Sequence, residues 1–226
     1  MKKLTLYVLF ICFSTASFSN AGFKIGAGVG VSAAKIKEKY YSDRNKNMLA
    51  FDVAIPMEIK VSKYFAIQPE IHFIQKGFGL KYYGVNGVEN IYRKRIYIEM
   101  PVNFKFVYPI RDKSFVNAYI GFGVGYALTN KQVTKYSDGQ KKKESFPYDN
   151  NVDDDNIAYR RYDLILPIGF GYEYKVSSKV SIYADLRWSL DVNNNIRYKV
   201  KPDPTPQYYY RNFIFSMGVN FIAKDK

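Results

Sequence analysis

Cysteine is almost absent from this chain of 226 residues, in which Cys12 is the single example. Cys12 lies in a segment that we expect to be removed, so the mature chain would contain no cysteine. This excludes a disulfide framework, a thiolate metal site and a cysteine nucleophile. Histidine is equally scarce, because His72 is the only one.

Long hydrophobic runs are missing as well. The apolar run from Leu4 to Phe13 follows two lysines and precedes a small-x-small site ending at Ala21, the pattern of a secretory signal peptide. The run is about half as long as the roughly 20 residues of a spanning helix. Cys12 lies within the run between bulky neighbours, which argues against a lipoprotein. We predict a cleavable signal peptide over residues 1–21, with cleavage after Ala21, and one domain over residues 22–226.

No later segment approaches the length of a spanning helix. The chain has instead eight segments in which apolar and polar residues alternate with a period of two, which indicates β-strands. Each is longer than the strand of about 5–6 residues in globular proteins and reaches the roughly 9–11 residues that cross a bilayer. The predicted strands cover residues 22–35, 48–61, 64–79, 92–107, 115–130, 159–175, 179–191 and 209–222.

The connections between these strands are alternately short and long. The short ones lie at Ser62-Lys63, within 108–114 and at Ser177-Ser178; the long ones are 36–47, 80–91, 131–158 and 192–208. Short periplasmic turns and longer extracellular loops are typical of barrels of the outer membrane. The sequence therefore predicts an all-β fold, an eight-stranded antiparallel up-and-down transmembrane β-barrel with both termini in the periplasm.

Tyrosines cluster where strands should meet the long loops, at Tyr40-Tyr41, Tyr82-Tyr83 and Tyr208-Tyr209-Tyr210. We expect these rings to form an aromatic girdle at the boundary between lipid and water. The alternative is the general preference of tyrosine for strands.

Four prolines fall inside predicted strands: Pro56, Pro69, Pro101 and Pro167. Proline removes a hydrogen-bond donor and is confined to edges or bulges of sheets. Since a closed barrel has no edge, we predict local bulges at these positions. The alternative is that a strand ends at its proline.

The two faces of each predicted strand differ sharply. In the second strand, Leu49, Phe51 and Val53 share one face, while Ala50 and Asp52 share the other. A soluble barrel of the lipocalin type would turn the apolar face inward, whereas a membrane barrel has a polar interior and an apolar outer belt. No segment after the signal has a helical period that could cover an exposed apolar face. We therefore expect the apolar face to meet lipid.

The charges on the polar face nearly balance, although the whole chain has a net charge of +14. The positive excess must therefore lie mainly in loops and tails. An eight-stranded barrel is just wide enough for side chains to fill it, and buried charges need partners. We predict a plugged, salt-bridged lumen, with eight glycines making room for long side chains. The predicted network comprises Lys24, Asp52, Glu58, Lys60, Glu70, His72, Arg95, Glu99, Lys105, Arg161, Asp163, Glu173, Asp185 and Arg187, with Lys76, Lys175 and Asp191 on the same face.

Signals for catalysis are weak. His72 shares the inward face with Glu70 and is either a catalytic base or metal ligand, or a histidine hydrogen-bonded within the polar core; the second interpretation is favoured. No serine has the spacing for a Ser–His–acid arrangement. The glycines at 121, 123 and 125 alternate within a strand, so they do not form a phosphate-binding loop. We expect no catalytic residue and no cofactor.

An acidic segment in the third long loop contains Asp149 and Asp153-Asp154-Asp155 among asparagines. Carboxylate and amide oxygens could hold Ca²⁺, but the glycine and distal glutamate of a calcium-binding hand are missing. A solvated polar loop is the favoured interpretation, and no metal site is predicted.

Three motifs resemble the PorT-like outer-membrane β-barrel family of Bacteroidetes. They are the strand ending Gln75-Lys76-Gly77, the segment Tyr97-Ile98-Glu99-Met100-Pro101-Val102 and the glycine-rich segment from Ala118 to Tyr126. The resemblance covers the mature chain and implies the barrel fold, with no catalytic residues to carry over. One branch of that family serves in secretion across the outer membrane. The C-terminal residues after Phe221 depart from the terminal aromatic that usually closes such barrels.

Three functions follow as hypotheses. The leading one is a non-enzymatic outer-membrane protein that acts through its extracellular loops or as an accessory part of an envelope or secretion assembly. The alternatives are a small porin and, more remotely, a barrel enzyme. The expected partners are outer-membrane lipid, the barrel-insertion machinery and envelope or secretion proteins; nucleic acid is not expected for an exported chain.

Overall fold

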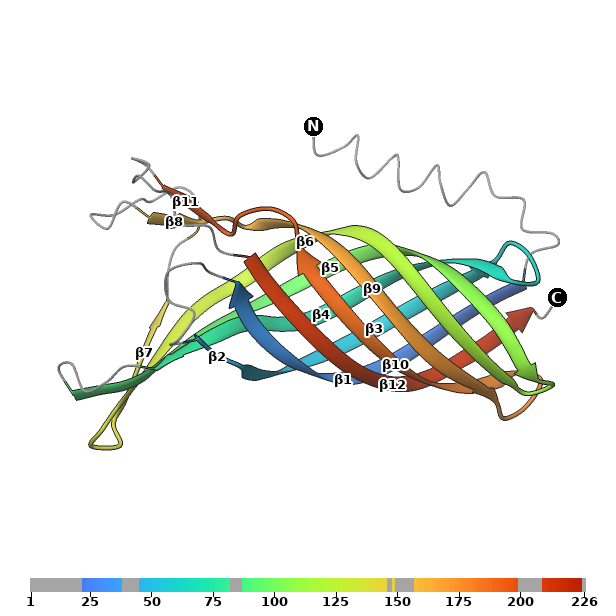
Figure 1. Cartoon of the computed structure of the whole chain (residues 1–226), viewed down its shortest axis with the longest axis horizontal. Coiled ribbons are helices and arrows are strands. Elements are labelled where there is room, and N and C mark those ends of the chain that lie inside the picture. The colour runs from blue at the N-terminus through green and yellow to red at the C-terminus, as the bar shows by residue number, and fades with distance from the viewer. Residues whose placement is uncertain are drawn as a thin grey trace.

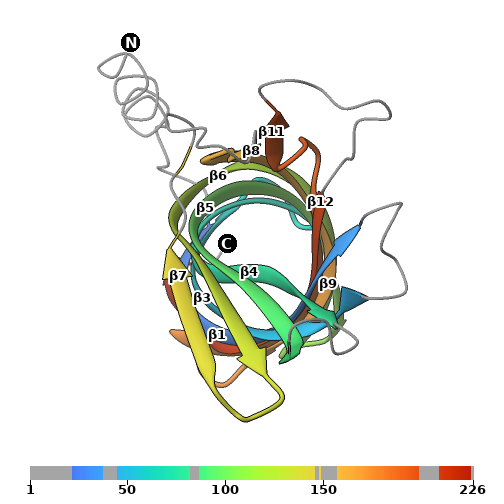
Figure 2. The same ribbon diagram turned by 90° about the vertical axis from the view of Figure 1, so that its left-hand side faces the viewer.

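Eight long antiparallel strands close into a ring in the computed structural model (Figure 1). The structure describes residues 22–37, 45–81, 87–145, 148, 157–198 and 209–224. Each strand of the ring pairs with its neighbours in sequence, and β1 pairs with β12 to close the barrel (Figure 2). The ring consists of β1 (Gly22–Lys37), β3 (Met48–Lys60), β4 (Phe65–Lys81), β5 (Val88–Arg111), β6 (Ser114–Tyr136), β9 (Tyr162–Lys175), β10 (Val180–Asp191) and β12 (Tyr209–Lys224). The predicted eight-stranded antiparallel barrel is confirmed; the predicted signal peptide lies outside the described residues.

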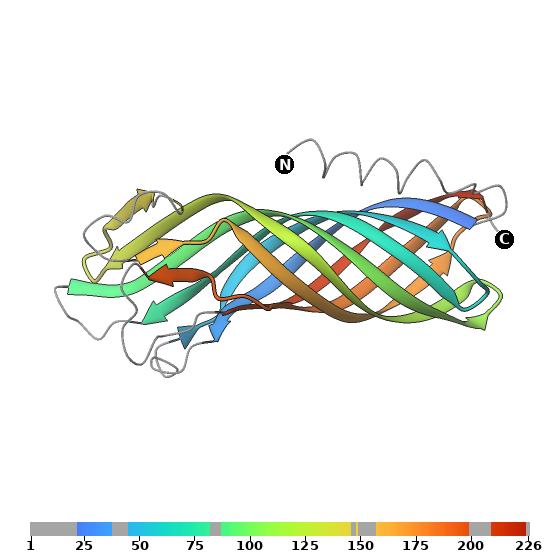
Figure 3. The same cartoon turned by 90° about the horizontal axis from the view of Figure 1, so that it is seen from above.

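The three short turns lie at one end of the barrel and the long connections at the other (Figure 3). Backbone hydrogen bonds close two of the turns, from Val61 to Phe65 at 2.9 Å and from Val176 to Val180 at 3.0 Å. The first residue of β1 pairs with Lys60 beside the first turn, and Lys224, the last residue of β12, pairs with Phe23, so both ends lie at this turn end. Among the described residues there is no helix long and apolar enough to cross a membrane.

The long connections contain more strand than the sequence predicts. β5 begins at Val88 and β6 continues to Tyr136, while β7 (Lys141–Ser145) pairs with β6. Three further short strands are β2 (Asn45–Lys46), paired with β4, and β8 (Ile157–Tyr159), paired with β11 (Ile196–Tyr198). Segments 80–91 and 131–158 are therefore not simple loops. Their strands have no continuous apolar face, as in Lys141–Ser145, so they lack the alternation that reveals a strand with one apolar face.

The prediction of bulges at the four internal prolines is wrong. The register of each pair of strands is the same before and after the proline. Instead, each proline lies beside a gap of two residue pairs in one ladder. In the pairing of β4 with β5, the ladder stops at Pro69–Val102 and resumes at His72–Glu99, and Pro101 lies within this gap. The missing proline N–H therefore interrupts the backbone pairing locally, but no extra residue is inserted into the strand. Real register shifts lie elsewhere, as at Ile96/Tyr97 in the pairing of β5 with β6.

Glycines lie opposite three of these positions and allow the strands to approach. Gly123 pairs with Pro101, and an added Cβ there would lie 2.5 Å from the Pro101 Cα and 2.7 Å from the Met100 carbonyl oxygen. Other glycines make room for rings, because Tyr119 covers Gly169 and Tyr183 covers Gly28. The expectation that glycines accommodate long side chains is therefore only part of their role.

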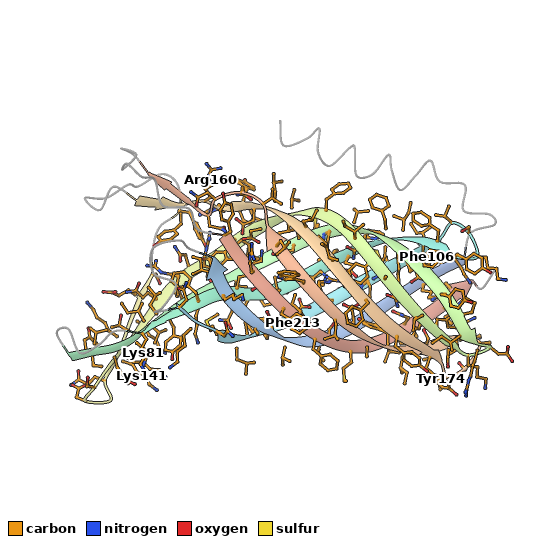
Figure 4. The ribbon with its side chains drawn as sticks, in the orientation of Figure 1. Lys81, Phe106, Lys141, Arg160, Tyr174 and Phe213 are labelled. Carbon is orange, nitrogen blue, oxygen red and sulfur yellow. The ribbon has the colours of Figure 1, made fainter. Side chains whose placement is uncertain are left out.

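Burial alternates along every strand of the ring. In β6, Ile120, Phe122 and Val124 are 52%, 60% and 47% exposed, while Tyr119 is 5% exposed and lies inside. Phe106, Phe213 and Tyr174, labelled in Figure 4, are also exposed on the outer surface. The apolar residues thus form the outer surface of the barrel, and the polar ones occupy its lumen.

Tyr210 is an exception to the predicted aromatic girdle. Its ring points into the lumen and is 1% exposed. Tyr40-Tyr41, Tyr82-Tyr83 and Tyr208 lie outside the described residues.

Candidate functional site

The lumen is crossed near the turn end by a chain of ion pairs. Lys24 Nζ of β1 lies 2.9 Å from Glu58 Oε1 of β3 and 2.8 Å from Glu173 Oε1 of β9. Lys105 of β5 donates to Glu58 Oε2 at 2.7 Å and to Gln68 Oε1 of β4 at 2.9 Å. Because these side chains come from five strands, the cluster joins opposite walls of the barrel.

A second cluster surrounds His72 in the middle of the barrel. The His72 ring lies between Asp52 Oδ1, 2.9 Å from Nδ1, and Glu70 Oε2, 2.7 Å from Nε2. Arg187 Nη2 lies 2.6 Å from the same Glu70 oxygen, and Arg187 Nε donates to the Tyr119 hydroxyl at 2.9 Å. His72 is 3% exposed, so this histidine is enclosed by charged partners.

A third cluster is built around Lys76 toward the loop end. Lys76 Nζ lies 2.5 Å from Glu99 Oε1, 2.5 Å from Asp191 Oδ1 and 4.0 Å from Asp163 Oδ2. The Lys76 side chain is fully buried. One ammonium group thus faces three carboxylates from β5, β9 and β10.

Four tyrosine rings surround Arg95 above this cluster. The guanidinium carbon lies 5.0 Å from the ring centre of Tyr97, 5.3 Å from Tyr148, 5.9 Å from Tyr159 and 5.6 Å from Tyr210. Rings over a guanidinium at this range give cation–π attraction. Arg95 also donates to the backbone carbonyl of Arg160. The arrangement closes the loop end of the lumen with apolar rings held by a buried cation.

The structure places the sequence-predicted network residues as follows. Eleven are buried in the lumen: Lys24, Asp52, Glu58, Glu70, His72, Arg95, Glu99, Lys105, Asp163, Glu173 and Arg187. Asp185 is half-buried and accepts from the Tyr119 hydroxyl at 2.7 Å. Arg161, also half-buried, donates to the Tyr126 hydroxyl at 2.9 Å. Lys60 is half-buried at the turn end.

The uncharged members of the network were not predicted from the sequence. Gln68 and Tyr119 connect charged groups, and Tyr97 and Tyr210 cover Arg95. Their positions share the inward parity of the charged residues, so strand alternation could have identified them. Tyr148 belongs to a loop and has no such signal.

Little space remains between the clusters. A cavity of about 30 Å³ lies between the turn-end and middle clusters, bordered by Glu58, His72, Lys105 and Arg187. A cavity of this size has room for a water-sized molecule. In the part of the chain that the structure describes, no three His, Cys, Asp or Glu side chains are arranged to hold a metal ion, and the Asp149–Asp155 segment lies outside that part.

The sequence profile of the family described as "Outer membrane protein beta-barrel domain" matches residues 14–197. The chain belongs to this family, and its place is therefore the outer membrane. No curated protein matches the chain.

Several solved structures are similar to the chain. Neisserial surface protein A shares 14% identity at a TM-score of 0.47, covering 89% of this chain and 98% of that protein. OprG from Pseudomonas aeruginosa shares 9% identity at a TM-score of 0.46, covering 91% and 97%. Ail of Yersinia pestis, solved with the heparin analogue sucrose octasulfate, shares 14% identity at a TM-score of 0.41, covering 88% and 99%.

Proposed function

We propose that this protein is a sealed, non-enzymatic outer-membrane barrel that acts through its loop end, with both termini in the periplasm. The observation that carries the proposal is the lumen. Three clusters centred on Lys24, His72 and Lys76 cross it at successive levels, and the rings around Arg95 cover its loop end. A solute would have to break buried ion pairs at every level, which is strongly unfavourable.

Conductance measurements test directly whether the lumen is sealed. We expect the purified, folded monomer to give no steady ohmic conductance in planar lipid bilayers. A charge-neutral double variant, Glu58→Ala with Lys105→Ala, should also give no steady conductance, because the His72 and Lys76 clusters and the rings around Arg95 still block the lumen. Steady channels from the unaltered protein would contradict the sealed lumen and favour the porin alternative.

The absence of enzymatic activity is part of the same proposal. It is supported by the surroundings of His72, whose ring nitrogens lie beside Asp52, Glu70 and Arg187. These contacts hold the ring in place inside the barrel. They suit a structural histidine better than a base that must reach a substrate.

The orientation of the barrel can be measured in intact cells. We expect Lys141→Cys, at the loop end, to react with a membrane-impermeant maleimide, while Lys63→Cys, in a turn, reacts only after the outer membrane is opened. The mature chain predicted from the sequence has no other cysteine, so the background is low. The reverse labelling pattern would place the loops in the periplasm.

We also propose an accessory role in an envelope or secretion assembly, as in the secretion branch of the PorT-like family. The motifs around Gln75-Lys76-Gly77 and Tyr97-Ile98-Glu99 support it. Crosslinking followed by affinity capture from outer membranes tests this role. Recovery of secretion-machinery components only from cells with the tagged protein would support it, and their absence would leave the loop end acting alone.

A further inference from the structure

A sheet extends beyond the rim of the barrel at the loop end. It is formed by the last residues of β4, the first residues of β5, the last residues of β6 and β7. Figure 2 shows these strands leaving the ring, and Figure 4 labels Lys81, the last residue of β4, and Lys141, the first residue of β7, in this sheet. This sheet is a direct continuation of the barrel wall, because β5 and β6 are continuous between the two.

Five lysines of β5, β6 and β7 share the outer face of this sheet: Lys94, Lys131, Lys135, Lys141 and Lys143, together called the lysine face. Lys94 pairs directly with Lys131, and Lys135 pairs directly with Lys141. Lys143 pairs with Val133, between the two lysine pairs. Like charges directly opposite each other on neighbouring strands destabilise a sheet. A negatively charged partner would therefore stabilise the lysine face.

That partner is not supplied by the described part of the chain. No ion pair there joins any of the five lysines to an acid, and Lys135 instead lies 5.1 Å from the ring centre of Tyr92. The inner face of the same sheet is different. Lys142 lies 2.7 Å from Glu144, whose hydrogen bond raises the pKa of Lys142, and Arg93 donates to Gln132 at 2.8 Å. Among the described residues, the charges of the inner face have partners and those of the lysine face do not.

Protection of a sheet edge explains only part of this pattern. β7 pairs with β6 alone in the described structure, and lysines on an edge strand discourage pairing with other chains. This would account for Lys141 and Lys143. It does not account for Lys94 and Lys131, which lie on strands that have neighbours on both sides at that level.

The position of the lysine face relative to the apolar belt suggests what covers it. On β5, Lys94 is followed on the same face by Ile96 and Ile98, and on β6 the exposed Leu128 lies three residues before Lys131. The lysines therefore begin where the lipid-facing surface ends. Phosphate headgroups occupy this level of a bilayer, and basic residues there attract anionic lipid.

The same arrangement recurs on another part of the rim. Lys35 of β1 pairs directly with Arg211 of β12, and Arg211 lies 6.0 Å from the ring centre of Trp188. The exposed Phe213 lies two residues further into the belt. A second like-charged pair beside an interfacial tryptophan supports a headgroup level at this height.

We propose that the lysine face binds the phosphate groups of outer-leaflet lipid. The inference rests on the proposed orientation, with the loop end outward, and adds a ligand class to it. Its physical basis is charge complementarity at a surface continuous with the lipid-facing belt. Lipid bound there would relieve the repulsion within the two lysine pairs.

Competition between two lipids that differ by one phosphate tests the proposal. The folded protein in neutral detergent is mixed with equal amounts of bisphosphorylated and monophosphorylated lipid A, and bound lipid is measured by native mass spectrometry. We expect the unaltered protein to prefer the bisphosphorylated form. Replacing all five lysines with glutamine should reduce this preference about tenfold or more, since each basic residue near a lipid surface contributes about fivefold. If the variant preferred the bisphosphorylated lipid as strongly as the unaltered protein does, the proposal would be overturned.

Matched variants locate the effect. Lys143→Gln should weaken the preference about fivefold, whereas Lys142→Gln, its neighbour on the balanced face, should not. Replacing Lys63, Lys113 and Lys179 at the turn end with glutamine should also leave the lipid preference unchanged. If these substitutions reduced the preference as much as those on the lysine face, the attraction would be a general electrostatic one and the proposed site would be refuted. Inorganic phosphate that displaced the lipid would identify a free-phosphate site instead.

The outcome is separate from that of the proposed function. Lipid preference is measured in detergent and depends on neither the orientation nor the sealed lumen. If the unaltered protein shows no lipid preference but the maleimide labelling is as expected, only the lipid site is refuted. If the labelling is reversed but the preference is observed, the proposed orientation is refuted. Heat-dependent gel mobility shows whether each variant has folded.

Discussion

Replacing Lys76 with methionine should lower the free energy of unfolding by about 3–5 kcal/mol, because it removes one partner from a buried ion cluster. Lys76 is fully buried and is the cation nearest to Glu99 and Asp191, each 2.5 Å away, with Asp163 at 4.0 Å. Without it, carboxylates remain desolvated with much weaker compensation. Urea titration in lipid vesicles, followed by the fluorescence of Trp188, the single tryptophan, measures the change.

A second substitution shows whether uncompensated charge is the cause. Adding Asp191→Asn to Lys76→Met should recover part of the lost stability, since one fewer carboxylate then lacks its ammonium partner. Lys142→Met removes an exposed lysine from its pair with Glu144 and should change stability little. If Lys76→Met were as mild as Lys142→Met, the Lys76 cluster would not stabilise the barrel.

The sequence was sufficient to predict the ring of strands because each one combines a long apolar face with a polar face. In β3, the alternation from Leu49 to Ile59 sets both the strand and the direction of its side chains. The same rule failed where neither face is apolar. Lys141-Lys142-Lys143 looks like a solvated loop in sequence, yet it forms β7 because the extended end of β6 offers a partner.

The members of the lumen network could be predicted better than their contacts. Parity along the strands indicates which side chains point inward, and it would also have placed Tyr210 inside, since Tyr210 has the parity of Ile214. Contacts across the lumen depend on strand tilt and stagger, which set the level of each residue. Lys24 and Glu173 are 149 positions apart, and no local pattern connects them. The prolines were misjudged because a ladder can lose two pairs without changing register.

A positive charge in the middle of the outer belt should be costly. Phe122 of β6 is 60% exposed and lies midway between the exposed Val116 and Leu128 on the same face. If this face meets lipid, Phe122→Arg places a guanidinium near the centre of the bilayer and should lower the free energy of unfolding by about 2–4 kcal/mol. On a surface that faced water, the same change would alter stability by roughly 0.5 kcal/mol or less. Urea titration in vesicles with Trp188 fluorescence measures the difference.

Depth provides the control for this prediction. Leu49 is 79% exposed on the outward face of β3, one residue after the strand begins at the loop end. Leu49→Arg should therefore cost only about 0–1 kcal/mol, because a charge near the interface reaches water and headgroups. Equal costs at the two positions would contradict a bilayer centred on Phe122. A large cost at Leu49 and a small one at Phe122 would indicate that the bilayer lies closer to the loop end. The lysine face would then lie within the apolar layer, where five unpaired lysines could not be tolerated.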